Sequence, residues 1–280
     1  MPNVHSTLTA LFTDIADAIR SKAGSSAPIV ADAFPSAIAA IPSGGGGGGD
    51  EGWTKLVDKT ISQAIDSSGE VLTVGSYAFY NCHSLTIASF PVATNIGRYA
   101  FVSCSALTTV SFPSVSSIYD YAFSGCSKLT EVTFPMAQRI DSNAFYACKS
   151  LTAAYFPSAK TLSTSAFAMC SNLATVSFPE ATTVYAHAFR MCNSLSTVIL
   201  PKVTSIGASA FAYCYNLVSL YLSAQYVCTL NNSNAFTSTP IGGYSVSAGQ
   251  YGSIYVPASL YSNYCSANVW AFFSDRIVSV

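Results

Sequence analysis

The residues of this chain that could do chemistry are nine cysteines and three histidines. A thiol beside an imidazole can act as a nucleophile, clustered thiols can bind zinc, and paired thiols can form disulfides. Cys82 and His83 are adjacent, but side chains of sequence neighbours tend to point in different directions. None of the three histidines lies at a recognisable spacing from a recurring Ser, Cys or acidic residue. No carboxylate pair or metal cluster stands out. We therefore expect no catalytic residue, no metal site and no cofactor.

Seven of the cysteines recur at a constant interval, which indicates a structural role in a repeat. Each follows a Phe by three residues and lies 22 residues from the next, without insertion or deletion. They are Cys82, Cys104, Cys126, Cys148, Cys170, Cys192 and Cys214. Stacked turns would place them about 4.8 Å apart, within disulfide range. However, an odd number of parallel side chains cannot fully pair, and free Cys packs as a small apolar group. We interpret the series as a buried thiol ladder, and leave open whether Cys228 and Cys265 pair.

The elements that must position this ladder follow from the rest of the repeat. Each Cys is followed three residues later by a Leu that opens an L-x-x-φ-x-φ run, where φ is apolar, as in Leu129 to Phe134. Such alternation turns one side of a short strand inward. One 22-residue turn cannot close a core, so successive turns must stack and share one. The period and spacing predict a leucine-rich repeat solenoid of short parallel strands joined by turns or short helices.

The complete frame is I-x-x-x-A-F-x-x-C-x-x-L-x-x-V-x-F-P, as at Ile118 to Pro135. This frame resembles the BspA-like bacterial leucine-rich repeat family over about residues 71 to 222. The resemblance implies a non-enzymatic protein used for adhesion or recognition, and it implies no particular ligand.

The segment before the repeats has a different composition. Apolar residues at helical spacing predict a helical attachment segment over 1–42, and six consecutive glycines make 43–52 a flexible linker. The pattern from Thr13 to Ile41 resembles N-terminal segments of tail and other virion-associated proteins of phages and prophages, which implies docking to a virion or other scaffold protein. Asp14 and Asp17 interrupt the apolar stretch, so we expect no secretory signal peptide there.

The remaining boundaries follow from where the period starts and stops. We expect an N-terminal cap over 53–74, seven repeats over 75–222, and a degenerate repeat with a cap over 223–280, the cap including one terminal helix from 258 to 273. Charged residues make up 9% of the chain and the net charge is −1. Without a basic stripe or a run of 18 apolar residues, we expect neither nucleic-acid binding nor membrane insertion.

Large side chains at outward positions are the candidate binding residues. One set interrupts a strand column of small hydroxyl residues: Tyr155, Ile199 and Tyr221. A second set precedes the repeat Phe by two residues in consecutive turns: Tyr77, Tyr99 and Tyr121, with Tyr119 and Tyr185 nearby. Exposed Tyr is favoured at recognition surfaces, although ordinary ladder packing between repeats explains it equally simply.

These observations lead to one functional hypothesis and one alternative. The hypothesis is a virion-associated protein of a phage or prophage, assembled in the bacterial cytoplasm, whose solenoid binds a host-surface glycan or protein. The alternative is a bacterial cell-surface adhesin of the same repeat family. Self-association is left open by the sequence.

Overall fold

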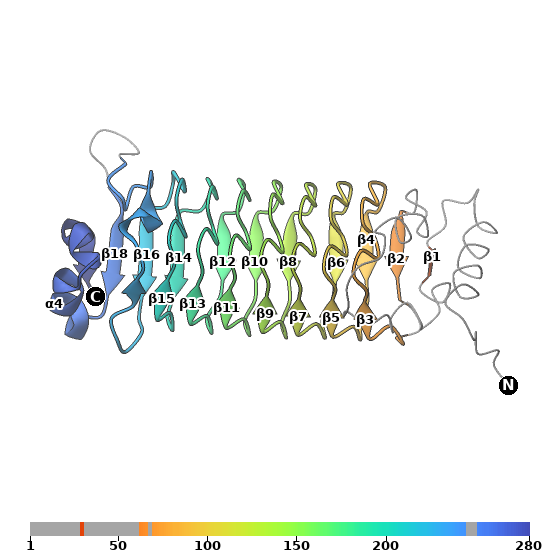
Figure 1. Ribbon diagram of the computed structural model, residues 1–280, viewed down its shortest axis with the longest axis horizontal. Coiled ribbons are helices and arrows are strands. Elements are labelled where there is room, and N and C mark those ends of the chain that lie inside the picture. The colour runs from red at the N-terminus through yellow and green to blue at the C-terminus, as the bar shows by residue number, and fades with distance from the viewer. Residues whose placement is uncertain (1–28, 31–61, 67–68, 245–250) are drawn as a thin grey trace, which may run out of the picture.

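The computed structural model describes residues 29–30, 62–66, 69–244 and 251–280. Over these residues the chain winds into a parallel β-solenoid, and the strands of successive turns lie side by side along its length (Figure 1). The predicted leucine-rich repeat solenoid is therefore confirmed. The expected segments 1–42 and 43–52 and the first part of the cap 53–74 lie outside the described residues, except for Ile29–Val30.

Each complete repeat contributes one strand to each of two faces, and further strands extend one of the faces at both ends. The long-strand face carries the L-x-x-φ-x-φ runs and comprises β1 (Ile29–Val30), β2 (Gln63–Ile65), β4 (Ile87–Ser89), β6 (Thr109–Ser111), β8 (Glu131–Thr133), β10 (Ala153–Tyr155), β12 (Thr175–Ser177), β14 (Thr197–Leu200), β16 (Ser219–Leu222), β18 (Ser253–Val256) and β19 (Ile277–Ser279). The short-strand face comprises β3 (Thr73–Val74), β5 (Asn95–Ile96), β7 (Ser117–Ile118), β9 (Arg139–Ile140), β11 (Thr161–Leu162), β13 (Thr183–Val184), β15 (Ser205–Ile206) and β17 (Thr229–Leu230).

All strand pairs are parallel, and the constant period sets their register. Tyr155 lies opposite Thr133 and Ser177, and Leu162 lies opposite Ile140 and Val184. The short-strand face is one continuous eight-stranded sheet, whereas the long-strand face consists of the sheets β1-β2-β4-β6, β8-β10-β12 and β14-β16-β18-β19. Equivalent residues of successive turns therefore lie above one another.

The core between the two faces consists of stacked columns of identical side chains. The Phe of the F-x-x-C motif stacks on its equivalent in the next turn, with ring centroids from 5.0 Å apart at Phe101–Phe123 to 5.6 Å at Phe167–Phe189. A second Phe column from the strand ends meets the first at steep angles, as at Phe156–Phe167. These rings are buried, and a fully buried Phe contributes about 1.5–3 kcal/mol.

A tight corner joins the short strand to the Phe and Cys columns. Two residues per corner have a positive φ, for example Asn143 (58°) and Ala147 (57°). Their backbone N–H groups donate to the next turn, from Asn143 to Thr164 at 3.0 Å and from Ala147 to Ala168 at 2.9 Å. The left-handed conformation thus places a row of backbone hydrogen bonds along the solenoid axis.

The prediction of a single terminal helix over 258–273 is wrong. Instead there are η3 (Ala258–Leu260), α4 (Tyr261–Ser266) and η4 (Trp270–Arg276), preceded by η2 (Ser233–Phe236) in the degenerate repeat. Ala267 is extended and ends α4. The break lets Tyr264 and Trp270 approach the same residue, which side chains six positions apart on one α-helix could not do.

The cap covers the end of the core, and two of its side chains form hydrogen bonds with the buried backbone N–H and carbonyl of Cys228. The N–H of Cys228 donates to the Tyr264 hydroxyl at 2.9 Å, and the Trp270 indole N–H donates to the Cys228 carbonyl at 2.5 Å. The Phe273 ring meets the last ring of the Phe column, Phe236, edge-on at 5.3 Å. Strand β19, which the sequence did not suggest, then pairs with β18. No helix within the described residues is long and apolar enough to cross a membrane.

Candidate ligand-binding surfaces

The thiol ladder lies in the core, and its members act as hydrogen-bond donors. The Cys148 thiol donates to the Phe123 carbonyl oxygen of the preceding turn, with 3.2 Å between Sγ and O. The same oxygen accepts the Cys126 N–H at 3.1 Å. Equivalent thiol bonds, of 3.0–3.2 Å, are made by Cys104, Cys126, Cys170, Cys192 and Cys214. The thiols therefore connect turns, beyond packing as small apolar groups.

Burial keeps these thiols protonated, as a donor must be. Desolvation raises the pKa of Cys214 and of Cys228 to about 12. It also raises the pKa of Cys104 and Cys148, where neighbouring thiols add to the effect. A thiol that stays neutral at physiological pH is a poor nucleophile and a poor metal ligand. All nine cysteines are free, Cys228 and Cys265 included.

Neither His83 nor His187, the two histidines that the structure describes, forms a hydrogen bond with one of these thiols. His83 Nδ1 lies 2.9 Å from the Ser103 carbonyl oxygen, and the ring is thereby bound to the next turn. His187 occupies a positive-φ corner position, and its buried Nδ1 has no hydrogen-bond partner among the residues that the structure describes. Among residues 29–30, 62–66, 69–244 and 251–280, no group of three or more His, Cys, Asp or Glu could hold a metal ion.

Two of the three predicted strand residues lie together on the long-strand face. Ile199 on β14 is directly opposite Tyr221 on β16, and 56% of Ile199 is exposed. Tyr155 on β10 is next to Ser177 in the same column, which separates it from Ile199. The predicted trio is therefore divided between a pair and an isolated tyrosine.

The structure extends this pair by two residues that sequence reasoning missed. Tyr255 on β18 lies opposite Tyr221, and their rings stack at 4.4 Å and 10°. Val278 on β19 lies opposite Tyr255 and is 38% exposed. We call Ile199, Tyr221, Tyr255 and Val278 the apolar patch. The motif Ile254-Tyr-Val-Pro257 indicates a strand after the irregular insertion, but it does not show by itself that Tyr255 continues the outward column of Tyr221.

The second predicted set forms a corner stack. Tyr77, Tyr99 and Tyr121 stack face to face, with centroids 4.9 and 5.0 Å apart. Each is partly buried and has a positive φ of 58–60°. The structure thus brings the three rings together, at a corner rather than on the long-strand face. Whether they bind a ligand stays a prediction.

A groove on the short-strand face was not predicted, although Tyr185, which lines it, was noted from the sequence beside the second tyrosine set. It has a volume of about 290 Å³ and is lined by Arg139, Asp141, Ser142, Thr161, Ser163, Thr164 and Tyr185. The Arg139 Nε donates to Asp141 Oδ1 at 2.7 Å, and the Arg139 guanidinium lies 5.2 Å from the centroid of the Tyr119 ring. The hydrogen bond to Asp141 raises the pKa of Arg139.

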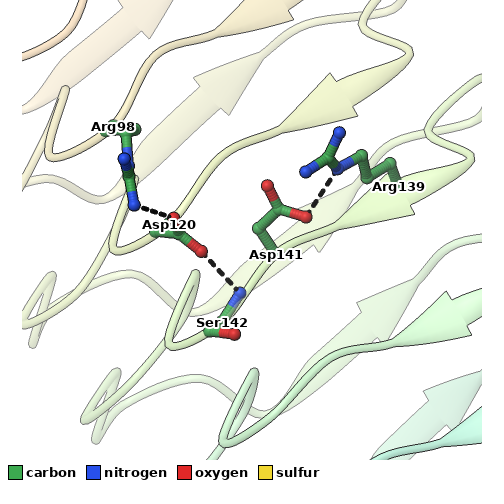
Figure 2. Close-up of polar contacts among 5 residues, drawn as sticks. All are labelled: Arg98, Asp120, Arg139, Asp141 and Ser142. Atoms are coloured by element: carbon green, nitrogen blue, oxygen red, sulfur yellow. Dashed lines mark hydrogen bonds and ion pairs between the residues drawn. The ribbon is translucent and has the colours of Figure 1, made fainter.

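A second ion pair supports the edge of this groove. Arg98 donates to Asp120 Oδ2 at 2.5 Å, and Asp120 Oδ1 accepts the Ser142 N–H at 3.1 Å (Figure 2). Exposed ion pairs add little stability, but these contacts hold Asp120 and Ser142 in defined positions. A sequence signal existed, since Arg139 and Asp141 are the charged exceptions in columns of otherwise neutral residues.

Comparison with solved structures finds similar bacterial leucine-rich repeat proteins. A leucine-rich cell surface protein from Faecalibacterium prausnitzii is 30% identical, with a TM-score of 0.52, over 55% of this chain and 44% of that chain. A leucine-rich repeat protein from Bacteroides ovatus is 22% identical over 66% and 59% of the two chains, with a TM-score of 0.43. The chain thus spans less than half of the length of the first and about three fifths of the second.

Family membership rests on the repeats themselves. No curated protein matches the chain. The family profile described as BspA type leucine rich repeat region matches residues 58–162 and 138–250, in six copies. These ranges cover more than half of the chain, and they include the F-x-x-C columns whose thiols and rings form the core. The chain therefore belongs to the BspA type leucine-rich repeat family.

Proposed function

We propose that this protein is a non-enzymatic adhesin of the bacterial cell surface, which binds a protein on an opposing surface through the apolar patch. The observation that carries the proposal is that the reactive side chains of the repeat lie in the core, whereas the outer surface of the strands carries residues suited to binding. The repeat thiols are buried donors, whereas the strand columns present fixed side chains outward. Such a wall can bind a partner through side chains whose positions are already set.

The apolar patch has the composition of a protein-binding surface. Aromatic residues are enriched at interfaces, where charged residues are depleted. Tyr221 and Tyr255 are held rigid by their mutual stacking, and Ile199 and Val278 extend the column on both sides. A preformed surface loses little conformational entropy on binding. The patch spans neighbouring strands of one sheet, which suits a protein better than a small molecule.

The location is supported by similarity and by the repeat family. The Faecalibacterium prausnitzii protein is described as a cell surface protein, and leucine-rich repeat solenoids typically serve as binding scaffolds. The virion-associated function depends on residues 13–41, of which only Ile29–Val30 are described, and none of the comparisons supports it. A scaffold-docking role for residues 1–42 stays a prediction.

The proposal is tested by binding of the full chain to a panel of immobilised extracellular-matrix and mucus proteins, measured by biolayer interferometry. The test variant is Ile199→Thr with Tyr221→Ser, because Thr133 and Ser177 occupy the same column and show that the strand accepts these residues. The control is Tyr226→Ser, since Tyr226 is 75% exposed and lies outside the column.

We expect saturable binding to at least one protein, weakened roughly tenfold or more in the test variant and unchanged in the control. Absence of saturable binding by the wild-type chain, or equal binding by the test variant, would overturn the proposal.

A further inference from the structure

We propose that the groove on the short-strand face binds one ring of a neutral sugar, as part of a surface glycan. This site is separate from the apolar patch, so the inference does not depend on protein binding there. Three observations carry it: the shape of one side-chain column, the set of free polar groups, and the balance of charge.

The shape comes from one column of residues that directly follow the short strands. In six consecutive turns the column holds Gly97, Tyr119, Asp141, Ser163, Tyr185 and Gly207. The Asp141 and Ser163 side chains are short and line the groove, and Tyr185 lines it one turn further along the column. With about 4.8 Å per turn, the two tyrosine positions are roughly 14 Å apart.

Tyr185 provides an exposed aromatic surface at one end of the groove. It is 49% exposed and lines the hollow. The apolar C–H face of a pyranose can pack against an aromatic ring, which combines an apolar body with a polar hydroxyl tip. A volume of about 290 Å³ lies at the lower end of the roughly 300–1,000 Å³ of small-ligand sites. The groove therefore suits a single ring with its chain continuing into solvent.

The polar groups of the groove match the hydroxyls of a sugar. Within the described part of the chain Arg139 donates a hydrogen bond through Nε only, and Figure 2 draws no dashed line from its two terminal nitrogens. The hydroxyls of Ser163 and Thr164 make no hydrogen bond to any residue that the structure describes. Each sugar hydroxyl both donates and accepts, so it can pair with the arginine donors and the carboxylate acceptor together.

The balance of charge favours a neutral ligand. Arg139 and Asp141 neutralise each other at 2.7 Å, and Arg98 and Asp120 do the same at the adjacent edge. An anion such as a phosphate would be repelled by the Asp141 carboxylate, and a cation would be repelled by the Arg139 guanidinium. A ligand with hydroxyls and no charge avoids both costs, since it accepts from one partner and donates to the other.

The ion pair is not required by the repeat itself. In the next turn the positions equivalent to Arg139 and Asp141 hold Thr161 and Ser163, with the same strand pairing. One turn among many therefore carries a charged pair that backbone geometry does not demand.

The inference is tested with the full chain and a panel of methyl glycosides of glucose, galactose, mannose, N-acetylglucosamine and N-acetylgalactosamine, using saturation-transfer NMR and titration calorimetry. The test variants are Arg139→Thr and Tyr185→Ser, which copy residues of equivalent turns. The controls are Tyr226→Ser and the patch variant Ile199→Thr with Tyr221→Ser.

We expect one or more of these sugars to bind saturably, with a loss of at least tenfold in both test variants and no change in the controls. Overturning results are the absence of saturable sugar binding, or sugar binding that survives Tyr185→Ser. A variant that weakens binding of a panel protein and not of a sugar would make the groove a protein surface, which also overturns the inference. Failure here would leave the patch result unaffected, because the two sets of variants share no residue.

Discussion

The Cys148 thiol donates a hydrogen bond to the carbonyl oxygen of Phe123, 3.2 Å away and one turn earlier in the solenoid. The bond lies within the core, and both residues are fully buried. Five further thiols repeat it, so the repeat Cys links successive turns through side chain and backbone.

Replacing Cys148 separates its donor role from its packing role. Cys148→Ala removes the donor and leaves a small cavity, and we expect a loss of about 1–2 kcal/mol in the free energy of unfolding. Cys148→Ser should cost less than the alanine variant, because the serine hydroxyl can donate to the same carbonyl. Urea unfolding followed by circular dichroism measures both, with the partly exposed Cys265→Ala as control. A serine variant less stable than the alanine variant would mean that apolar packing dominates.

The protonated thiols make stability depend on pH in the alkaline range. Burial raises the pKa of Cys214 from 9.0 to about 12, so between these values the folded state holds a proton that the unfolded state has lost. Stability from this group is complete below pH 9 and falls as the pH rises towards 12. We expect denaturation midpoints to decrease from pH 8.5 to pH 11, and less steeply in Cys214→Ser. Equal slopes in Cys214→Ser and the wild type would contradict this.

The left-handed corners predict opposite effects for two substitutions at equivalent positions. Gly125 and Ala147 occupy the same corner position in consecutive turns, with φ of 74° and 57°. We expect Gly125→Ala to destabilise the fold by about 1 kcal/mol, since a side chain is strained there. Ala147→Gly should be neutral or slightly stabilising, because relief of that strain offsets the added entropy of the unfolded chain. Thermal melts of both variants check this, and a destabilising Ala147→Gly would argue against strain.

The cap residues predict where unfolding begins. Trp270→Phe removes the donor to the Cys228 carbonyl, and Tyr264→Phe removes the acceptor for the Cys228 N–H. Each variant leaves a buried polar group unpaired, which costs about 1–3 kcal/mol. Hydrogen exchange should accelerate first in the last turns, near Cys228, and later around Phe123. Uniform acceleration along the solenoid would show that the cap does not protect its own end.

The sequence predicted the solenoid because one interval governs every core column. Phe123 and Cys126 could be assigned to buried positions from spacing alone. The thiol bond could not, since its direction depends on corner backbone that side-chain pattern does not encode. The strand of Tyr255 could be recognised, but the irregular insertion before it breaks the period, so its register with Tyr221 could not be counted from the repeat. The groove at Arg139 was missed because outward residues were considered on the long strands and at the tyrosine corner only.

The central claim is that the outer wall of this solenoid binds and that the apolar patch is where it does so. The most direct test is adhesion of beads that carry the full chain to a surface coated with the protein it binds in the panel, counted under flow. We predict that wild-type and Tyr226→Ser beads adhere and that beads with Ile199→Thr and Tyr221→Ser detach. Equal retention of all three would contradict the claim.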